Sequence, residues 1–184
     1  EKGFITTADT GGLPLEWGDI EMAHTLLDLT AQRQGFGDIL AEGVKRIAAR
    51  FGAEDLAVHV NGLAPPAHDP RAVPGMAIAY ATSPRGACHV QGDAYMVDLG
   101  LTIAELGIYP GDRFEIQGKA ETVARLQDWR ALYNSAIMCM FVNPTAPILG
   151  KLLSEATAWP YELEDWLRAG ERAFYVKRAL NNRL

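Results

Sequence analysis

Residues 119–141, KAETVARLQDWRALYNSAIMCMF, decide the fold because they contain the longest helical pattern in the sequence. A helical period of three or four residues is kept there by Val123, Leu126, Trp129 or Arg130, Tyr133, Ile137 and Met140. This spacing puts them on one side of an α-helix, so the segment predicts a helix with a buried face. The pair Asn143-Pro144 follows and is expected to close the helix.

Other helices are predicted before and after this segment. Asp19 is a suitable N-cap for a helix that ends at Gly35, and a second helix is expected from its cap Asp38 to Gly52. Because the turn between them is short, the two should pack as an antiparallel hairpin. The remaining helical patterns cover 74–84, a segment near 98–106, and segments near 146–157 and 161–181. Strand patterns are short and isolated, which predicts an all-α, multihelical fold: a helical hairpin followed by a loop-rich helical domain.

Length and composition exclude several classes of protein. At about 150 residues per domain, 184 residues predict one domain or two small ones. Residues 53–71 are rich in proline and glycine and predict a boundary, so we divide the chain into 1–58 and 59–184. The net charge of −6, without a cluster of Lys or Arg, argues against nucleic-acid binding. No uncharged apolar run reaches the roughly 18 residues of a membrane span. Two cysteines are too few for a disulfide scaffold and favour a cytoplasmic, reducing compartment.

The segment Ala81-Thr-Ser-Pro-Arg-Gly-Ala-Cys-His89 gathers chemically active side chains directly after a predicted helix. Arg85 offers a planar fork of donors suited to an oxyanion, and His89 can move protons near neutral pH. Each also has a simpler interpretation, Arg85 as a surface charge and His89 as a structural histidine. Cys88 is expected to pack as a small apolar side chain. The residues alone therefore indicate a candidate site without fixing its chemistry.

Cys139 lies within the apolar run 136–141, and its simplest interpretation is a buried thiol on a helix. One cysteine cannot hold zinc or an iron–sulfur cluster, since both usually need four ligands. His68 is expected to be a loop histidine with no near partner. The sequence contains no phosphate-binding loop, dinucleotide fingerprint, nucleophile elbow or zinc-protease motif.

Three segments, taken together, resemble one family. GGLPLEWGD with QGFGDILAEGVKRIAARFG resembles the "WGD … G.GD.LAEGV" hairpin of the tungsten-containing aldehyde ferredoxin oxidoreductases. APPAHDPRAVPGMAIAYATSPRGACH is similar to that family's "PAYDPRG..G..LAYATS.RGACH" stretch, and YNSAIMCMF resembles its "D..GLC.F" motif. The three occur in the family's order, and the first two are specific.

The resemblance implies an enzyme that oxidises aldehydes to carboxylic acids and passes the electrons to ferredoxin. Its cofactors would be a tungsten or molybdenum bis-pterin and a 4Fe-4S cluster. Residues 1–58 would end the family's second domain and 59–184 would form its third, both helical. The implied site has His89 as the catalytic residue beside the metal and Cys139 as one cluster ligand. The positions implied to contact the cofactor are Arg85, Gln91, Asn134 and Met138.

The chain also departs from the family pattern. Gln91 replaces a pterin-binding lysine, Asn134 replaces an aspartate, and Ile137 and Met138 replace a glycine and a leucine. His68 stands where the family has tyrosine. The family's other three cluster cysteines and its N-terminal β-domain have no counterpart in these residues, so this chain alone is expected to bind no intact cofactor and to be inactive. A homo-oligomer is compatible with this interpretation. The alternative is a stand-alone helical subunit that keeps the fold without the cofactor.

Overall fold

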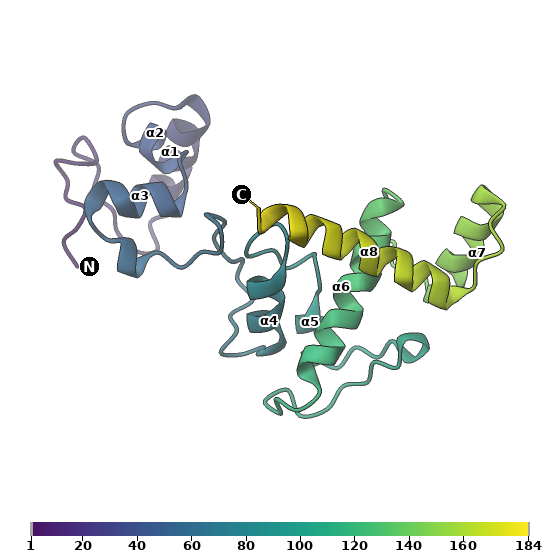
Figure 1. Ribbon diagram of the computed structural model, residues 1–184. Coiled ribbons are helices and arrows are strands. Elements are labelled where there is room, and N and C mark those ends of the chain that lie inside the picture. Colours follow the sequence, from purple (N-terminus) through teal and green to yellow (C-terminus); the bar gives the residue numbers. More distant parts are fainter. Residues whose placement is uncertain (1, 184) are drawn as a thin grey trace. The chain divides into compact units, whose positions relative to one another are not determined.

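The structure is a computed structural model, and it describes residues 2–183 (Figure 1). These residues form eight α-helices and two short 3-10 helices, with two isolated β-bridges and no strand among them. The all-α prediction is therefore confirmed. The chain divides into two compact units, the first running to Ala64 and the second beginning at Pro65.

The first unit contains α1 (Ile20–Gln32), α2 (Phe36–Leu40), α3 (Val44–Phe51) and the 3-10 helix η1 (Glu54–Leu56). The predicted cap is present, since an Asp19 carboxylate oxygen accepts the Met22 N–H at 2.9 Å. Helix α1 ends two residues earlier than predicted, because Arg33 already has the left-handed backbone expected of Gly35. Gly52 ends α3 as predicted.

The helix predicted from Asp38 to Gly52 is two helices in the structure. Gly43 has a φ of 80° and interrupts it, so Asp38 lies inside α2 and does not cap a helix. The α1–α2 hairpin is packed closely at Gly37. A Cβ there would lie 2.1 Å from the backbone carbonyl carbon of Leu29, so the contact requires glycine. The hairpin itself is present, with α1 against α2.

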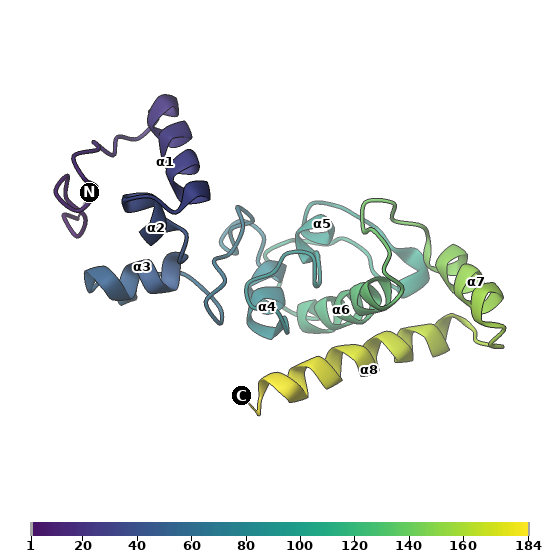
Figure 2. The same ribbon diagram turned by 90° about the horizontal axis from the view of Figure 1, so that it is seen from above.

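The second unit is built around α6 (Lys119–Ser135) and α8 (Leu163–Asn181), which lie side by side in Figures 1 and 2. Val123, Leu126, Trp129 and Tyr133 are at most 2% exposed and form the core-facing side of α6. At the crossing, a Cβ on Gly170 would lie 2.1 Å from the Asp128 carbonyl oxygen. The two backbones therefore approach each other without a side chain between them.

Three shorter helices complete the second unit, α4 (Gly75–Thr82), α5 (Ala94–Asp98) and α7 (Ala146–Thr157). The prediction at 146–157 is confirmed to the residue, and α8 begins two residues after its predicted start. The helix predicted near 98–106 is wrong. Those residues form an open loop with the 3-10 helix η2 (Ala104–Leu106), because Ile103 and Ile108 pair through their backbones and tighten the chain into a turn.

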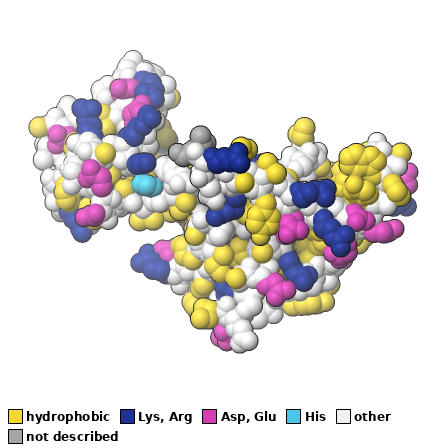
Figure 3. All heavy atoms as spheres, in the orientation of Figure 1, with side chains coloured by type: hydrophobic (Ala, Val, Ile, Leu, Met, Phe, Trp, Pro, Cys, Tyr) yellow, Lys and Arg dark blue, Asp and Glu magenta, His cyan; other side chains and the backbone are white. Residues whose placement is uncertain are grey.

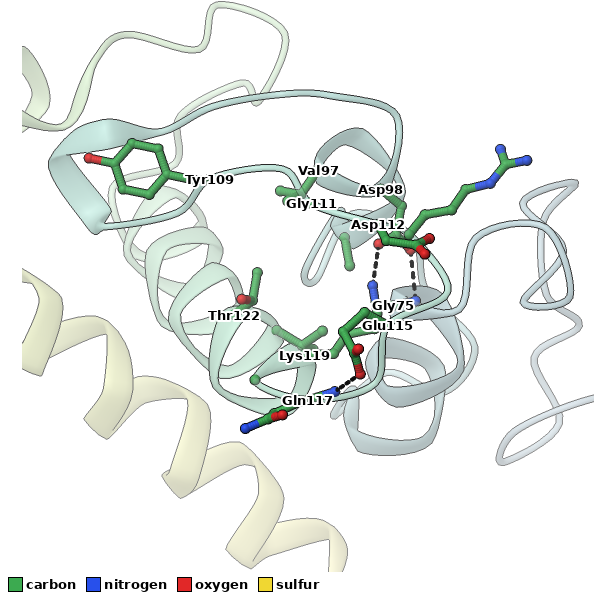
Figure 4. Close-up of a pocket in the computed structure, with 14 residues that line it drawn as sticks. Gly75, Val97, Asp98, Tyr109, Gly111, Asp112, Glu115, Gln117, Lys119 and Thr122 are labelled. Carbon is green, nitrogen blue, oxygen red and sulfur yellow. Dashed lines mark hydrogen bonds and ion pairs between the residues drawn. The ribbon is translucent and has the colours of Figure 1, made fainter.

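Asp98 joins the starts of α4 and α6 at the end of α5. One carboxylate oxygen accepts the Gly75 N–H at 2.8 Å and the other accepts Lys119 Nζ at 2.6 Å (Figure 4). The Lys119 and Asp98 side chains are 12% and 5% exposed. They form the floor of a cavity of about 190 Å³ beneath loop 109–118. Through these two bonds Asp98 connects α6 to the first residue of α4, the helix that leads into the candidate site.

Candidate active site

The segment from Ser83 to Asp93 leaves the C-terminal end of α4 and is held by contacts from distant parts of the chain. Arg178 Nη1 on α8 donates to the Thr82 carbonyl at 2.5 Å, and Asn181 Nδ2 donates to the Pro84 carbonyl at 2.6 Å. The first bond satisfies a carbonyl group that the end of α4 leaves free, and the second holds the residue two positions beyond it. The turn itself is tightened at Gly86, which has a φ of 91°. The α8 helix therefore positions the first part of the candidate site.

Arg85 is exposed, and its guanidinium lies over a buried thiol. The distance from Arg85 Nη2 to Cys88 Sγ is 2.8 Å, and Cys88 is 6% exposed. Cys88 packs with the core as expected. The remaining donors of the Arg85 fork stay available to an external oxyanion.

His89 is half-buried and belongs to a group of three rings that the sequence did not predict. Its ring centroid lies 5.3 Å from that of His68 and 6.4 Å from that of Tyr95. His68 and Tyr95 stack at 4.0 Å with 7° between their planes. The expectation that His68 has no near partner is therefore wrong, because the chain between them folds back through α4. Burial lowers the pKa of His89, and the nearby His68 and Arg85 lower it further against a smaller opposing effect of Asp93, which favours the neutral imidazole.

A buried ion pair lies behind these rings and connects them to the end of α6. Arg130 donates through Nε and Nη2 to the two Asp93 carboxylate oxygens at 2.8 and 2.7 Å. The two side chains are 3% and 2% exposed. Arg130 Nη1 also donates to Asn143 Oδ1 at 3.1 Å. Asp93 follows His89 by four residues, and Asn143 follows Cys139 by four. One guanidinium thus holds both loops that carry predicted site residues.

Cys139 is exposed and lies in a loop, so its prediction as a buried helical thiol is wrong. The physical reason is the early end of α6. Ile137 has a φ of 54°, the Met138 N–H donates to the Tyr133 carbonyl, and the Ile137 N–H donates to the Asn134 carbonyl. This is the Schellman pattern, in which a left-handed residue ends a helix. The apolar pattern in the sequence continues past Ile137, but the left-handed backbone of Ile137 ends the helix there.

The loop after α6 presents apolar side chains to solvent beside the thiol. Ile137 is 94% exposed, Phe141 87% and Val142 69%. Tyr133 anchors the far end of this loop through a 2.8 Å bond from its hydroxyl to the Pro144 carbonyl. The loop is therefore fixed at both ends while its apolar face is left uncovered.

The other predicted cofactor contacts occupy different environments. Asn134 is exposed in the last turn of α6, and Met138 is half-buried just beyond it. Gln91 is only 2% exposed and lies in the protein interior. Its neighbour Gly92 has a φ of 134°, and a Cβ there would lie 2.6 Å from Gln127 Cγ. Close packing against α6 therefore requires glycine directly after Gln91.

The first unit also has an uncovered apolar surface. None of the residues of α1 is buried, and Ile20 and Leu27 are each 67% exposed. A cavity of about 690 Å³ lies between α1 and the N-terminal segment, lined in part by Phe4, Leu15 and Met22. In the second unit, Figure 3 shows apolar side chains gathered over α7, where Ile148 and Leu152 are about half exposed. Such surfaces are typical of polypeptide that another protein segment covers.

Residues 2–183 contain no group of three His, Cys, Asp or Glu side chains arranged to hold a metal ion. None of the helices in this range combines the length and the apolar content that a bilayer crossing requires.

Comparisons with known proteins agree with the resemblance seen in the motifs. The family model described as "Aldehyde ferredoxin oxidoreductase, domains 2 & 3" matches residues 1–184. The tungsten-containing aldehyde ferredoxin oxidoreductases of Pyrococcus furiosus and Pyrococcus abyssi are 35% and 36% identical over 98% of this chain, which spans 30% of each. The WOR-like subunit of an aliphatic sulfonate oxidoreductase from Pyrococcus furiosus is 30% identical over 98% of the chain, which spans 26% of it. The chain belongs to the aldehyde ferredoxin oxidoreductase family and corresponds to its C-terminal part.

Proposed function

We propose that this chain forms the helical wall of a redox active site that oxidises aldehydes to carboxylic acids and passes the electrons to ferredoxin. The observation that carries the proposal is the Arg130 link, which holds the His89 loop and the Cys139 loop on one buried side chain. The names of the Pyrococcus relatives favour tungsten over molybdenum as the metal of the bis-pterin. The chain spans 30% of those relatives, so the complete activity belongs to a longer protein.

The side chains present suit such a cofactor. Arg85 projects an exposed guanidinium whose fork can bind pterin phosphate or carbonyl oxygens, and Asn134 offers an exposed amide. Cys139 is an exposed thiol surrounded by apolar side chains, which suits one ligand of a 4Fe-4S cluster with low solvent access. The buried Gln91 and the half-buried Met138 would complete the set of residues that hold the cofactor. The other three cluster ligands would come from polypeptide outside this chain.

His89 would be the catalytic residue. Oxidation of an aldehyde by water yields a carboxylic acid, two protons and two electrons. The bis-pterin metal centre supplies the two-electron chemistry when bound. The neutral imidazole of His89 is favoured, because burial lowers its pKa, so a ring nitrogen can accept one of the two protons. Arg85 lies near it and can neutralise negative charge on the carboxylate product.

The uncovered apolar surfaces support a role for missing polypeptide. The α1 face and the loop at 136–143 expose large apolar side chains that water solvates poorly. We assign residues 1–58 to the end of the family's second domain and 59–184 to its third, so that the remainder of the protein would cover both surfaces. A stand-alone helical subunit would be expected to have a polar surface at these places.

The test is made on the full-length protein purified without air. His89→Ala should lower aldehyde-dependent dye reduction by about 100-fold or more, the usual contribution of general acid–base catalysis, while tungsten content stays close to that of the wild type. Cys139→Ser should lower the iron content and the visible absorbance of the cluster. His59→Gln, at a half-buried histidine of the first unit to which the proposal gives no role, is the matched control for a histidine replacement. Unchanged turnover in His89→Ala would remove this residue from the mechanism.

A further inference from the structure

His68 is a histidine of the site that the proposed function leaves without a role. It lies on the loop before α4, and its backbone carbonyl accepts the Tyr80 hydroxyl at 2.9 Å. Its ring stacks face to face on Tyr95 of α5 at 4.0 Å. Both contacts fix the residue, one through its backbone and one through its ring. The position of the His68 imidazole relative to His89 is therefore determined by α4 and α5 together.

The two imidazoles are close enough to sense each other's charge. Their centroids are 5.3 Å apart with 47° between the planes, and both side chains are half-buried. At this distance two positive charges repel each other strongly where water is partly excluded. A state in which both rings carry a proton is therefore disfavoured.

The other charges around the pair do not cancel this repulsion. Arg85 adds a positive charge near His89. Asp93 is the negative group on the same side, but both of its oxygens are bound by Arg130. On the other side, Asp69 is paired with Arg71 at 2.5 Å in the loop next to His68. Tyr80, Cys88 and Tyr95 are the remaining titratable neighbours, and none of them is cationic.

We propose that His68 is a positioning residue for His89, and that the two imidazoles act as a pair in which a positive charge on one ring opposes protonation of the other. The pair keeps His89 available as a proton acceptor. The repulsion between the two rings keeps the proton affinity of His89 low, so a proton that His89 takes up is readily returned to solvent. The consequence for turnover rests on the proposed function, whereas the pairing of the two rings does not.

The decisive variant is His68→Phe, because phenylalanine keeps an aromatic ring on Tyr95 and removes the titratable group. Exchange of the histidine C2 hydrogen with deuterium, followed residue by residue by mass spectrometry over a pH series, gives the titration midpoint of His89 in the full-length protein. The midpoint should move to higher pH in His68→Phe. It should stay at the wild-type value in His59→Gln, which removes a half-buried histidine of the first unit.

A merely structural role gives a different result. If His68 only fills space, His68→Phe leaves the His89 midpoint unchanged, and only His68→Ala, which opens the site to water, moves it. That outcome overturns the proposal. In an active preparation, the acid limb of the pH–rate profile should move to higher pH together with the exchange midpoint. If the His89 exchange midpoint moves in His68→Phe but the full-length protein oxidises no aldehyde, the pairing of the two imidazoles stands and the proposed function is wrong.

Discussion

Arg130 is the residue whose replacement most directly tests how the site is held together. In Arg130→Met the apolar volume is kept, but the Asp93 carboxylate stays in an interior where it is 2% exposed and has lost both donors. Removing one partner of a buried ion pair usually costs about 3–5 kcal/mol. The lost bond to Asn143 adds little, since Asn143 is exposed and water replaces the donor. The cost therefore comes mainly from the uncompensated carboxylate.

A double-mutant cycle separates this charge effect from lost packing. Urea unfolding is followed by tryptophan fluorescence, with Trp129 next to Arg130 as a buried probe. At a slope of about 2 kcal/mol per M, the midpoint should fall by about 1.5–2.5 M in Arg130→Met. The double variant Arg130→Met with Asp93→Leu should recover most of this loss, because an apolar pair of similar volume replaces a buried ion pair at little cost. If the losses of the two single variants simply add in the double variant, the reasoning is refuted.

Three further perturbations follow from particular backbone and charge environments. Ile137→Gly should stabilise the protein by about 0.5–1 kcal/mol in the same urea assay. Ile137 has a φ of 54°, which is strained for a side chain with a Cβ, and its 94% exposed side chain loses no packing when it is removed. A lower unfolding midpoint would contradict this argument from backbone strain. Burial and the neighbouring Glu171 raise the pKa of Asp128 from 3.8 to about 6, so its carboxyl favours folding below pH 4 and this contribution is lost as the pH rises through 6. Asp128→Asn should therefore raise stability at pH 7 by on the order of 1 kcal/mol, discounted for partial exposure, and an equal gain at pH 4 would show that the carboxylate charge is not the cause. Gly170→Ala should lower the free energy of unfolding by about 1–3 kcal/mol and so lower the thermal midpoint, since the new Cβ would lie 2.1 Å from the Asp128 carbonyl oxygen. An unchanged midpoint in calorimetry would mean that α6 and α8 can move apart to make room for it.

Most helices could be predicted because their signals are local. The cap at Asp19 and the glycine stop at Gly52 each act within one helical turn. The errors arose where a local signal competed with backbone geometry. Gly43 broke an otherwise continuous apolar pattern, and Ile137 adopted a conformation that its residue type disfavours. A pattern of apolar residues carries no information about which backbone angle a single residue takes.

The candidate site was predicted only as a set of residue types. The motif placed a cation, a thiol and an imidazole at Arg85, Cys88 and His89, and the structure places these three on one turn. The contact of His68 with His89 spans 21 residues, and the bonds of Arg130 span 37 and 13. Such contacts depend on how helices pack, which a periodicity does not specify.

The shared guanidinium has a consequence for local opening. Arg130 bonds to Asp93 in the segment after His89 and to Asn143 in the segment after Cys139. If Arg130 moves away with one of these segments, the hydrogen bonds that it makes to the other segment are lost. Amide hydrogens near both segments should therefore exchange with solvent as a single cooperative unit. Opening of the segment around Cys139 should therefore also open the segment around His89, at a lower free-energy cost than unfolding of the helices.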